Sequence, residues 1–301
     1  MVKEMIVTIG VFDGVHRGHR ALIEELLNIA QLKKMAPMVI TFNNKPSSII
    51  DPQRSHLMLS SQTDKRQLLE SLGVSDIVFL DFNHDIAKMS AKDFLLYISK
   101  SYNVKAMLMG HDHIFGSDRI TDLAQYVAIG NELDIEVIKS KTKIFDNDRE
   151  RISSSKIRHL ISSGNVLHAS KLLGYFYILR GNVVEGMKIG RTIGYPTANI
   201  VPDIKNKLLP HHGVYAVFAV FDGKKYPAML YIGRRPTLDN GTDISIEVNI
   251  FDINVNLYSR QIEVEFIDFV REDCRFKDLS ELKNRIYKDE QEVRKILSKY
   301  F

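Results

Sequence analysis

The sequence predicts two domains, an α/β domain followed by a small antiparallel β-barrel with a C-terminal helix. The chain has 301 residues, about twice the length of an average domain. Its first half alternates apolar runs with helix-like stretches, and its second half contains closely spaced strand-like runs. We place the boundary near 164–174, so the expected domains are 1–170 and 171–301.

The first half has the pattern of a parallel sheet that helices cover. A helix is expected at 17–34, where Leu22, Leu26 and Ile29 recur at helical spacing. Strands that alternate with helices favour a parallel sheet with both faces covered. The expected strands are 6–12, 38–42, 76–80 and 106–110.

The second half has the pattern of a small barrel, which closely spaced antiparallel strands favour. Asp222-Gly223 separates two apolar runs and is typical of a two-residue hairpin. A final amphipathic helix is expected at 280–299. The expected strands are 177–184, 214–221, 226–232, 244–251 and 261–270.

The composition is that of a folded globular protein, with 45% hydrophobic and 26% charged residues. No apolar run approaches the roughly 20 residues that span a bilayer, and the first residues lack a signal peptide's apolar core. We therefore expect a cytoplasmic protein that binds no membrane. The single cysteine, Cys274, excludes an internal disulfide framework and a multi-cysteine zinc site. The net charge of +4 comes from interspersed charges, which disfavours nucleic acid and suits small anionic ligands such as nucleotides.

The segment from Gly10 to His19, GVFDGVHRGH, joins the first expected strand to the first expected helix. Free backbone N–H groups and the positive end of the helix dipole at such a junction attract phosphate. His16 and His19 are three residues apart and therefore share one face of the first helical turn. Gly18, between them, leaves room for a ligand to approach. The segment therefore predicts a site that holds a triphosphate.

A second segment, from Ile152 to Arg158, opens a short helix with serines and two basic residues. Serines at a helix start are commonly N-caps, whereas cations in the first turn oppose the helix dipole. The placement of Lys156 and Arg158 is more favourable if an anion binds at the same point. We therefore expect a second phosphate-binding element here.

The first segment resembles the HxGH signature of the nucleotidyltransferase superfamily, in the FDGVHxGH form of bacterial bifunctional riboflavin kinase/FAD synthetases. The second segment resembles the ISSTxIR motif of the same family, with Ser155 in place of the usual threonine. The resemblance implies a Rossmann-like domain that transfers an adenylyl group from ATP to FMN, which yields FAD and pyrophosphate. The FMN phosphate would attack the α-phosphorus directly, so that catalysis comes from positioning and charge stabilisation.

The resemblance also implies roles for single residues of the first half. His16 and His19 act on the phosphates, and Arg158 helps to hold the pyrophosphate. The two phosphate-binding motifs would close on ATP from opposite sides. The other residues that the resemblance assigns to the nucleotide are Gly10, Phe12, Asp13, Gly14, Gly18, Ser154 and Ser155.

Two segments that the family uses for the flavin differ in this chain. Where the family has TFxPHP, Asn44 and Lys45 replace the proline and the following histidine. Where the family has GxDFRFG, Asp112 and Phe115 match and are expected to bind flavin, but the two residues between them do not match. The motifs for ATP are intact, whereas the flavin segments are altered.

The segment from Gly190 to Asn199, GRTIGYPTAN, is the main motif of the second half. Thr197 and Asn199 are two residues apart, so in an extended segment their oxygens face the same way. Such a pair can bind Mg²⁺, a hard cation that also keeps waters and nucleotide oxygens. The segment resembles the GxxxGxPTAN motif of riboflavin kinases. This implies that Gly190, Thr197 and Asn199 bind ATP, with Thr197 and Asn199 at the Mg²⁺.

Further matches follow in the order of the riboflavin kinase family. Gly233 begins a segment similar to the end of NIGxxPT, although Tyr231 stands where asparagine is usual. Glu247 lies in an expected strand on the face opposite the isoleucines, where the family places its catalytic base. The resemblance implies that Glu247 takes the proton from the riboflavin 5′-hydroxyl. Arg271 belongs to a segment similar to RxExxF and is expected to bind flavin.

We interpret the chain as a bifunctional enzyme that makes FMN from riboflavin in a riboflavin-kinase barrel and FAD from FMN in the α/β domain. ATP is the co-substrate of both reactions, and the flavins are substrates or products rather than prosthetic groups. The changes at Asn44, Lys45, His113 and Ile114 favour one alternative, a monofunctional riboflavin kinase with an impaired adenylyltransferase domain. A non-catalytic flavin- or nucleotide-binding protein is the second alternative. The third is another small-molecule nucleotidyltransferase, which would leave the barrel motifs unexplained.

Overall fold

A computed structural model of the chain has two compact units, Met1–Ser153 and Ser154–Phe301. The predicted change from an α/β to a β-barrel architecture is confirmed. At 234–236, 242 and 243 only the backbone is described. The residues that the structure describes are 3–44, 46, 49, 57–110, 114–142, 151–186, 190, 193–236, 242–253 and 255–300.

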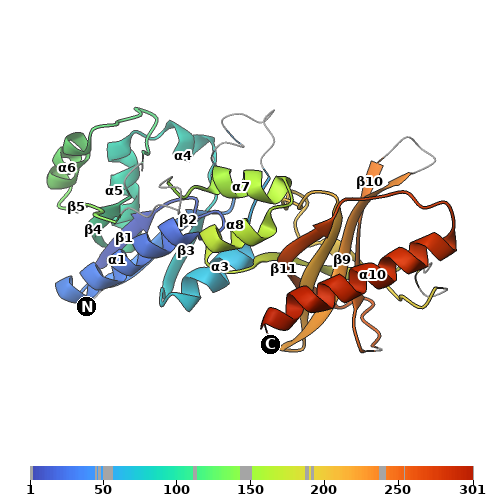
Figure 1. The fold of residues 1–301 in the computed structure, drawn as a ribbon. Helices are drawn as coiled ribbons and strands as arrows, with labels where there is room; N and C mark the ends of the chain where they lie inside the picture. Colours follow the sequence, from blue (N-terminus) through green and yellow to red (C-terminus); the bar gives the residue numbers. More distant parts are fainter. Residues whose placement is uncertain are drawn as a thin grey trace. The chain divides into compact units, whose positions relative to one another are not determined.

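The first unit contains a parallel sheet with the strands β1 (Met5–Ile9), β2 (Ala36–Phe42), β3 (Asp76–Leu80), β4 (Val104–Met109) and β5 (Glu136–Lys139). The strand order is β3-β2-β1-β4-β5 (Figure 1). Strands are added first on one side of β1 and then on the other. The carboxyl end of β1 therefore lies at a topological switch point, where open α/β sheets bind ligands. The helices of this unit include α1 (Arg17–Lys33), α3 (Gln62–Ser71), α4 (His84–Lys88), α5 (Ala91–Tyr102) and α6 (Leu123–Glu132).

Side chains that alternate along the strands give this sheet two apolar faces. Val7 of β1 packs in one buried core with Phe94 of α5. Ile6 packs in the other core with Ile23 of α1 and Leu69 of α3. Helices α1 and α3 therefore cover one face and α5 covers the other, as the sequence predicts.

The second unit contains a closed antiparallel barrel with the strands β6 (Tyr177–Val184), β7 (Ala198–Pro202), β8 (Gly213–Phe221), β9 (Lys224–Pro236), β10 (Thr242–Ile250) and β11 (Gln261–Arg271). The order around the barrel is β10-β7-β6-β11-β8-β9. Asp222 and Gly223 have positive φ values of 50° and 70° and join β8 to β9. The predicted two-residue hairpin is therefore confirmed, because such turns require positive φ at both central residues.

Helices of the second unit pack against this barrel. Val293 and Leu297 of α10 (Leu279–Leu297) are buried with Ala216 of β8 and Met229 of β9. Helix α7 (Ser154–Ser162) contacts α8 (Val166–Leu173), which in turn contacts β6 and β11. The boundary that the sequence predicts, near 164–174, runs through α8, and the contacts group both α7 and α8 with the barrel. The limits 1–170 and 171–301 of the catalytic domains stay a prediction.

Some element boundaries differ from those predicted, for local reasons. Strand β1 ends at Ile9 rather than at residue 12, because Phe12 and Val15 have positive φ values of 47° and 32° and turn the chain. The sequence analysis did not identify β5, which has no fully buried residue, or β7, which contains the polar Asn199. Short strands without a continuous apolar run give little signal in a sequence.

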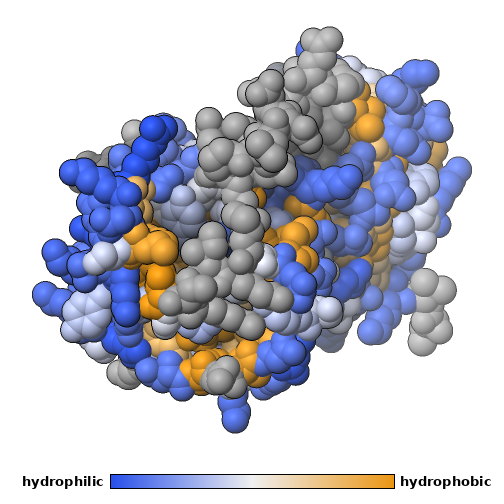
Figure 2. Space-filling model, turned by 90° about the vertical axis from the view of Figure 1, so that its right-hand side faces the viewer, coloured by the Kyte–Doolittle hydropathy of each residue, from blue (hydrophilic) through white to orange (hydrophobic). Residues whose placement is uncertain are grey.

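Hydrophobic side chains on the surface are dispersed where the residues are described. In the view of Figure 2 they form several separate patches (orange) between hydrophilic side chains (blue). Exposed apolar residues of the second unit include Val201 of β7 and Tyr287 of α10. Single apolar residues on a surface are normal. Among the described helices, none combines the length and the apolar character that a membrane crossing requires.

Candidate active sites

In the first unit, the start of α1 brings two histidine rings together. His16 is the N-cap of α1, and its Nδ1 accepts a hydrogen bond from the backbone N–H of His19 at 3.3 Å. The two rings are stacked, with centroids 3.6 Å apart. Because Nδ1 of His16 is an acceptor, a neutral His16 carries its proton on Nε2. This Nε2–H can donate a hydrogen bond to a phosphate oxygen.

His19 is held in its neutral form. Burial lowers its pKa well below the usual value, and the proximity of His16 and the positively charged Lys65 lowers this pKa further. Its Nδ1 is buried and has no hydrogen-bond partner among the described residues. The ring of Phe12 stands edge-on to it at 5.1 Å. His19 can therefore bind a phosphate by donating one N–H, rather than as a fixed cation.

The loop between β1 and α1 is fixed by a segment that the sequence analysis missed. The Asp13 carboxylate is 1% exposed and accepts hydrogen bonds from the backbone N–H groups of Leu59 at 2.9 Å and Ser60 at 3.2 Å. The backbone N–H of Gly14 donates to the Ser60 hydroxyl at 2.9 Å. Asp13 thus holds the loop in shape, and its contact with a nucleotide stays a prediction.

Two glycines of this segment make room for aromatic rings. A Cβ at Gly18 would lie 3.2 Å from the His16 ring, and a Cβ at Gly10 would lie 3.0 Å from the Phe12 ring. Both distances are shorter than ordinary van der Waals contact. The sequence predicts that Gly18 makes room for a ligand; in the structure it makes room for the His16 ring.

A buried lysine lies at the same edge of the sheet. Lys65 of α3 is 1% exposed, and its ammonium donates to the Thr41 hydroxyl at 3.3 Å and to the Phe42 carbonyl at 3.2 Å. Its positive charge acts on His19. The sequence analysis missed Lys65 because a lysine in a helical pattern is normally exposed. No sequence signal identified it.

The segments that the resemblance assigns to flavin in this unit take part in local packing. The Asn44 amide exchanges two hydrogen bonds with the backbone of Phe82, at 2.8 and 2.9 Å. The Phe115 ring packs against Phe94 and Tyr126, with centroids 5.6 and 4.8 Å away. The residues of these segments that lie outside the described part of the chain are Lys45, His111, Asp112 and His113. Flavin binding by Asp112 and Phe115 stays a prediction.

Helix α7 begins at the second predicted phosphate motif. Ser154 and Ser155 lie in its first turn, and Arg158 follows one turn later. The fully buried Ile157 and Ile161 anchor the helix. The motif therefore stands at a helix start, as predicted, and its phosphate contacts stay a prediction.

In the second unit, strand register brings residues from separate segments into one row. Glu247 of β10 lies opposite Asn199 of β7 on one side and Tyr231 of β9 on the other. Tyr231 lies opposite Val214 of β8, and Val214 lies opposite Arg271 of β11. Cross-strand partners in an antiparallel sheet project to the same face. These side chains therefore share one face of the barrel.

A cavity of about 350 Å³ lies between this face and α10. Val214, Tyr231 and Glu247 of the row line it, together with Leu282 and Ile286 of α10. Its walls are mostly apolar, and the carboxylates of Glu247, Asp273 and Asp289 are among the polar groups that line it. Such a cavity suits a largely apolar ligand that places a polar group beside Glu247.

Both oxygens of the Glu247 carboxylate accept hydrogen bonds from hydroxyl groups. Ser245 Oγ donates to Oε1 at 2.9 Å, and Thr197 Oγ1 donates to Oε2 at 3.1 Å. The neighbours of Glu247 along the strand, Ile246 and Val248, are buried. Side chains alternate between the two faces of a strand, so Glu247 lies opposite them, as predicted. The carboxylate is thus oriented at the cavity wall.

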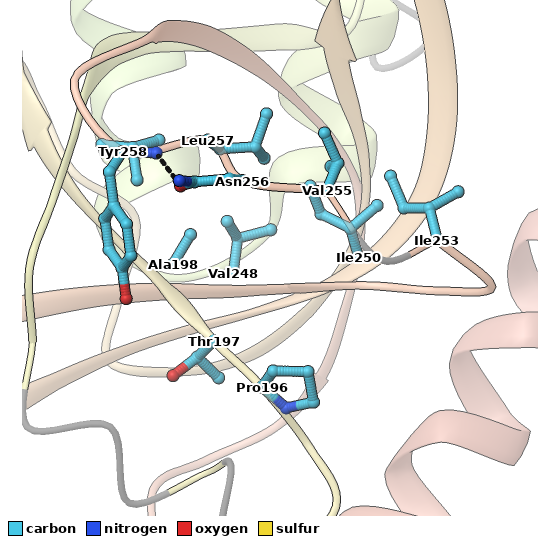
Figure 3. Close-up of a pocket in the computed structure, with 11 residues that line it drawn as sticks. Pro196, Thr197, Ala198, Val248, Ile250, Ile253, Val255, Asn256, Leu257 and Tyr258 are labelled. Atoms are coloured by element: carbon cyan, nitrogen blue, oxygen red, sulfur yellow. Dashed lines mark hydrogen bonds between the residues drawn. The ribbon is translucent and has the colours of Figure 1, made fainter.

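A second cavity, of about 400 Å³, also has Thr197 in its wall. Figure 3 shows the apolar side chains of Val248, Val255 and Leu257 around it, with the phenol ring of Tyr258. The loop after β10 supplies most of these residues, which the sequence analysis did not assign to a site. Thr197 therefore connects an apolar, partly aromatic cavity with the cavity that contains Glu247.

Thr197 and Asn199 offer neutral, hard oxygen ligands. Asn199 is 8% exposed, and a Cβ at Gly186 would lie 2.0 Å from its amide nitrogen, so Gly186 makes space for this side chain. Within the described part of the chain, no cluster of three His, Cys, Asp or Glu residues could hold a metal ion. A hydroxyl and an amide suit Mg²⁺ that brings waters and phosphate oxygens with it. The donor set therefore fits a nucleotide-bound Mg²⁺.

Gly190 closes the loop that precedes Thr197. The backbone N–H of Tyr195 donates to the Gly190 carbonyl at 2.7 Å. A Cβ at Gly190 would lie 2.1 Å from the Tyr195 carbonyl oxygen, so only glycine fits. The structure supports a role for Gly190 in loop shape, and its contact with ATP stays a prediction.

Arg271 lines the cavity under α10 and ties that helix to the barrel. Its Nε lies 2.9 Å from both carboxylate oxygens of Asp289, and its Nη2 lies 2.7 Å from one of them. Asp289 is 1% exposed and also pairs with Arg285 at 2.9 Å. Arg271 therefore fixes the cavity wall, and its contact with flavin stays a prediction.

The two folds and their sites define the class of protein as a nucleotidyltransferase-like α/β unit joined to a riboflavin-kinase-type barrel. The FAD synthetase family model matches residues 1–156, and the riboflavin kinase family model matches residues 173–297. The chain belongs to the family of bifunctional riboflavin kinase/FMN adenylyltransferases, as its motifs predict.

Curated relatives match along nearly the whole chain. The bifunctional riboflavin kinase/FMN adenylyltransferase of Escherichia coli (strain K12) is 34% identical over 291 residues, which cover 96% of this chain and 91% of that protein. The protein of the same name from Bacillus subtilis (strain 168) is 32% identical over 292 residues, with the same coverage.

A crystal structure from Streptococcus pneumoniae, described as a macrolide-efflux protein, has the same fold. Its TM-score is 0.89 at 34% sequence identity, and the match covers 98% of this chain and 95% of that one. The name macrolide-efflux protein applies to that structure and is not transferred to this chain. The match extends over both units of this chain.

Proposed function

We propose that the barrel unit phosphorylates riboflavin with ATP to form FMN, and that the α/β unit adenylylates FMN with ATP to form FAD and pyrophosphate. Membership of the bifunctional family supports both activities. The observation that carries the kinase activity is Glu247, which lines an apolar cavity and has both carboxylate oxygens oriented by hydroxyl groups. We assign the two activities to 1–170 and 171–301.

In the kinase reaction, riboflavin occupies the cavity under α10. Val214, Leu282 and Ile286 supply apolar walls for the flavin ring. Glu247 accepts the proton of the 5′-hydroxyl as that oxygen bonds to the γ-phosphorus of ATP, and ADP leaves. Because Glu247 is an oriented carboxylate, it needs no rearrangement to take this proton.

In the kinase reaction, ATP lies beside Thr197. Its base fits the second cavity, where the Tyr258 ring and apolar side chains are available. Thr197 and Asn199 would hold Mg²⁺ together with the phosphates. When bound, Mg²⁺ neutralises phosphate charge. Gly190 shapes the loop that presents these two residues.

In the adenylyl transfer, an FMN phosphate oxygen bonds to the α-phosphorus of ATP, and the bond to pyrophosphate breaks. The attacking phosphate is already ionised, so the reaction needs no protein nucleophile. His16 and neutral His19 donate N–H groups to the phosphates, and the start of α1 adds its dipole. From the sequence, we assign Ser154, Ser155 and Arg158 to the nucleotide and the pyrophosphate.

The cellular compartment of both reactions is inferred from their substrates. ATP is an intracellular co-substrate, and a single cysteine suits a reducing compartment. We therefore place both reactions in the cytoplasm, without a nucleic acid or membrane partner. FMN and FAD pass through as substrate or product.

A direct assay tests the proposed function. The purified chain is incubated with ATP, Mg²⁺ and either riboflavin or FMN, and the flavins are separated by chromatography. We expect FMN and then FAD from riboflavin, and FAD from FMN. Formation of FMN without FAD would support a monofunctional kinase instead. Binding of flavin without any product would support a non-catalytic binding protein.

A further inference from the structure

Ser245 is a buried serine beside Glu247 that no motif includes. It lies two residues before Glu247 on the same strand and is 6% exposed. Its hydroxyl donates to Oε1 of Glu247 at 2.9 Å, while Thr197 donates to Oε2 at 3.1 Å. Each carboxylate oxygen of Glu247 thus accepts a hydrogen bond from a different part of the chain.

We propose that Ser245 is a positioning residue for riboflavin phosphorylation, which holds the Glu247 carboxylate in the orientation that accepts the hydroxyl proton. This inference rests on the proposed role of Glu247 as the base. The terminal torsion of a glutamate is broad, so the hydrogen bonds that its oxygens accept set the orientation of its carboxylate. Donors on both oxygens fix the plane of the carboxylate and therefore the direction of its remaining lone pairs.

The hydrogen bond from Thr197 to Glu247 can change during turnover. A hydroxyl has one proton and two lone pairs, so Thr197 can donate to Glu247 while its oxygen binds a cation. Its position then depends on the nucleotide that enters and leaves. Ser245 is not among the described residues that line either cavity, so it acts on the reaction through Glu247. Ser245 therefore helps to orient the Glu247 carboxylate in a way that does not depend on the nucleotide.

The test compares Ser245→Ala with Ser245→Thr in riboflavin phosphorylation. The alanine variant should lower kcat about 10-fold, because a misoriented base transfers the proton less often. The KM values for riboflavin and ATP should stay within about 2-fold, since neither substrate touches Ser245. The threonine variant keeps the hydroxyl and should retain most of the rate. If alanine proves unstable, Ser245→Cys offers similar volume with a weak donor and should show the same loss.

Two controls accompany this test. Ser170 of α8 is also 6% exposed, and its hydroxyl donates to the Val166 carbonyl at 2.8 Å, away from the cavities. Ser170→Ala should leave riboflavin phosphorylation unchanged. FAD formation from supplied FMN should be unchanged in every variant, because its proposed catalytic residues lie in the other unit.

A double-mutant cycle separates orientation from simple packing. If Ser245 acts through Glu247, Ser245→Ala should cause no further loss in a Glu247→Gln background. A further 10-fold loss in that background would overturn the inference. If Ser245→Ala turns over normally while Glu247→Gln is slow, the inference about Ser245 is also overturned. Glu247 would then still be supported as the base. Normal turnover of Glu247→Gln would instead refute the proposed base itself.

Discussion

The two candidate sites are built in different ways from the same chain. In the α/β unit, His16, His19 and Gly18 come from one ten-residue segment at the end of β1. In the barrel, Glu247 and Asn199 come from different strands that meet through their register. The first site therefore depends on the conformation of a loop, whereas the second depends on strand pairing. A register slip of one residue would move every side chain of a strand to the other face.

This difference makes the two activities good controls for each other. The contact pattern divides the chain into two compact units; the proposed catalytic residues His16 and His19 lie in the first, and Glu247 lies in the second. Folded domains with separate cores respond to mutation separately. A change in one site should therefore leave the other reaction near its normal rate.

The largest expected effect is in the barrel. Glu247→Gln keeps the size of the side chain but removes the base, so riboflavin phosphorylation should fall by about 10²–10⁴-fold. FAD formation from supplied FMN should stay normal, because its nucleophile is an ionised phosphate. The measurement is the initial rate of each reaction with separated flavin products. A loss below a few-fold would show that Glu247 is an ordinary strand carboxylate.

The next effect is in the loop site. His16→Asn replaces the imidazole and keeps a good N-cap for α1, so the helix start is preserved. FAD formation should fall by about 10²–10³-fold, as expected when a donor to a transition-state charge is removed. Riboflavin phosphorylation should be unaffected. Equal loss of both reactions in a folded variant would contradict the assignment of the two activities to separate sites.

The sequence predicts the loop site more completely than the barrel site, for a physical reason. His16 and His19 are neighbours on one helical turn, so a short motif identifies their geometry. Motifs also identify Asn199, Glu247 and Arg271 of the barrel row, but the order of the row depends on strand register. Lys65 was missed because its burial follows from the packing of α3, which a single sequence does not show.

The contacts around Glu247 illustrate the same limit. Ser245 and Tyr231 were not predicted as members of the site, although both belong to expected strands. A serine in a strand carries no signal of its own. Only the fold shows that its hydroxyl meets a carboxylate two residues later on the same face. The predicted fold class is confirmed, while the chemistry of these supporting residues required the structure.

A smaller effect tests how tightly the loop site is packed. In Gly18→Ala the new methyl group would lie 3.2 Å from the His16 ring and should displace it from the stacked pair. We expect FAD formation to fall about 10-fold, because small misplacements of catalytic groups are costly. Asn28→Ala, at an exposed position of the same helix, is the matched control. A normal rate in Gly18→Ala would show that the ring position is not critical.

The smallest expected effect concerns Asn44, where the family pattern and the structure suggest different roles. Its amide exchanges two hydrogen bonds with the Phe82 backbone, which joins the ends of β2 and β3. Asn44→Ala should therefore cost about 1–2 kcal/mol and lower the Tm of the α/β unit by about 2–6 °C.

The matched control for Asn44→Ala is a substitution of its neighbour, Asn43. The Tm and the KM for FMN then decide whether Asn44 serves the fold or the flavin site. Asn43 makes an exposed hydrogen bond with Asp81, so Asn43→Ala should change the Tm much less. If Asn44 serves the fold, the KM for FMN should stay within about 2-fold in Asn44→Ala. A raised KM for FMN at an unchanged Tm would instead place Asn44 in the flavin site, as the family motif implies. In that case Asn44→Pro combined with Lys45→His should lower the KM for FMN, because it restores the family's residues at both positions.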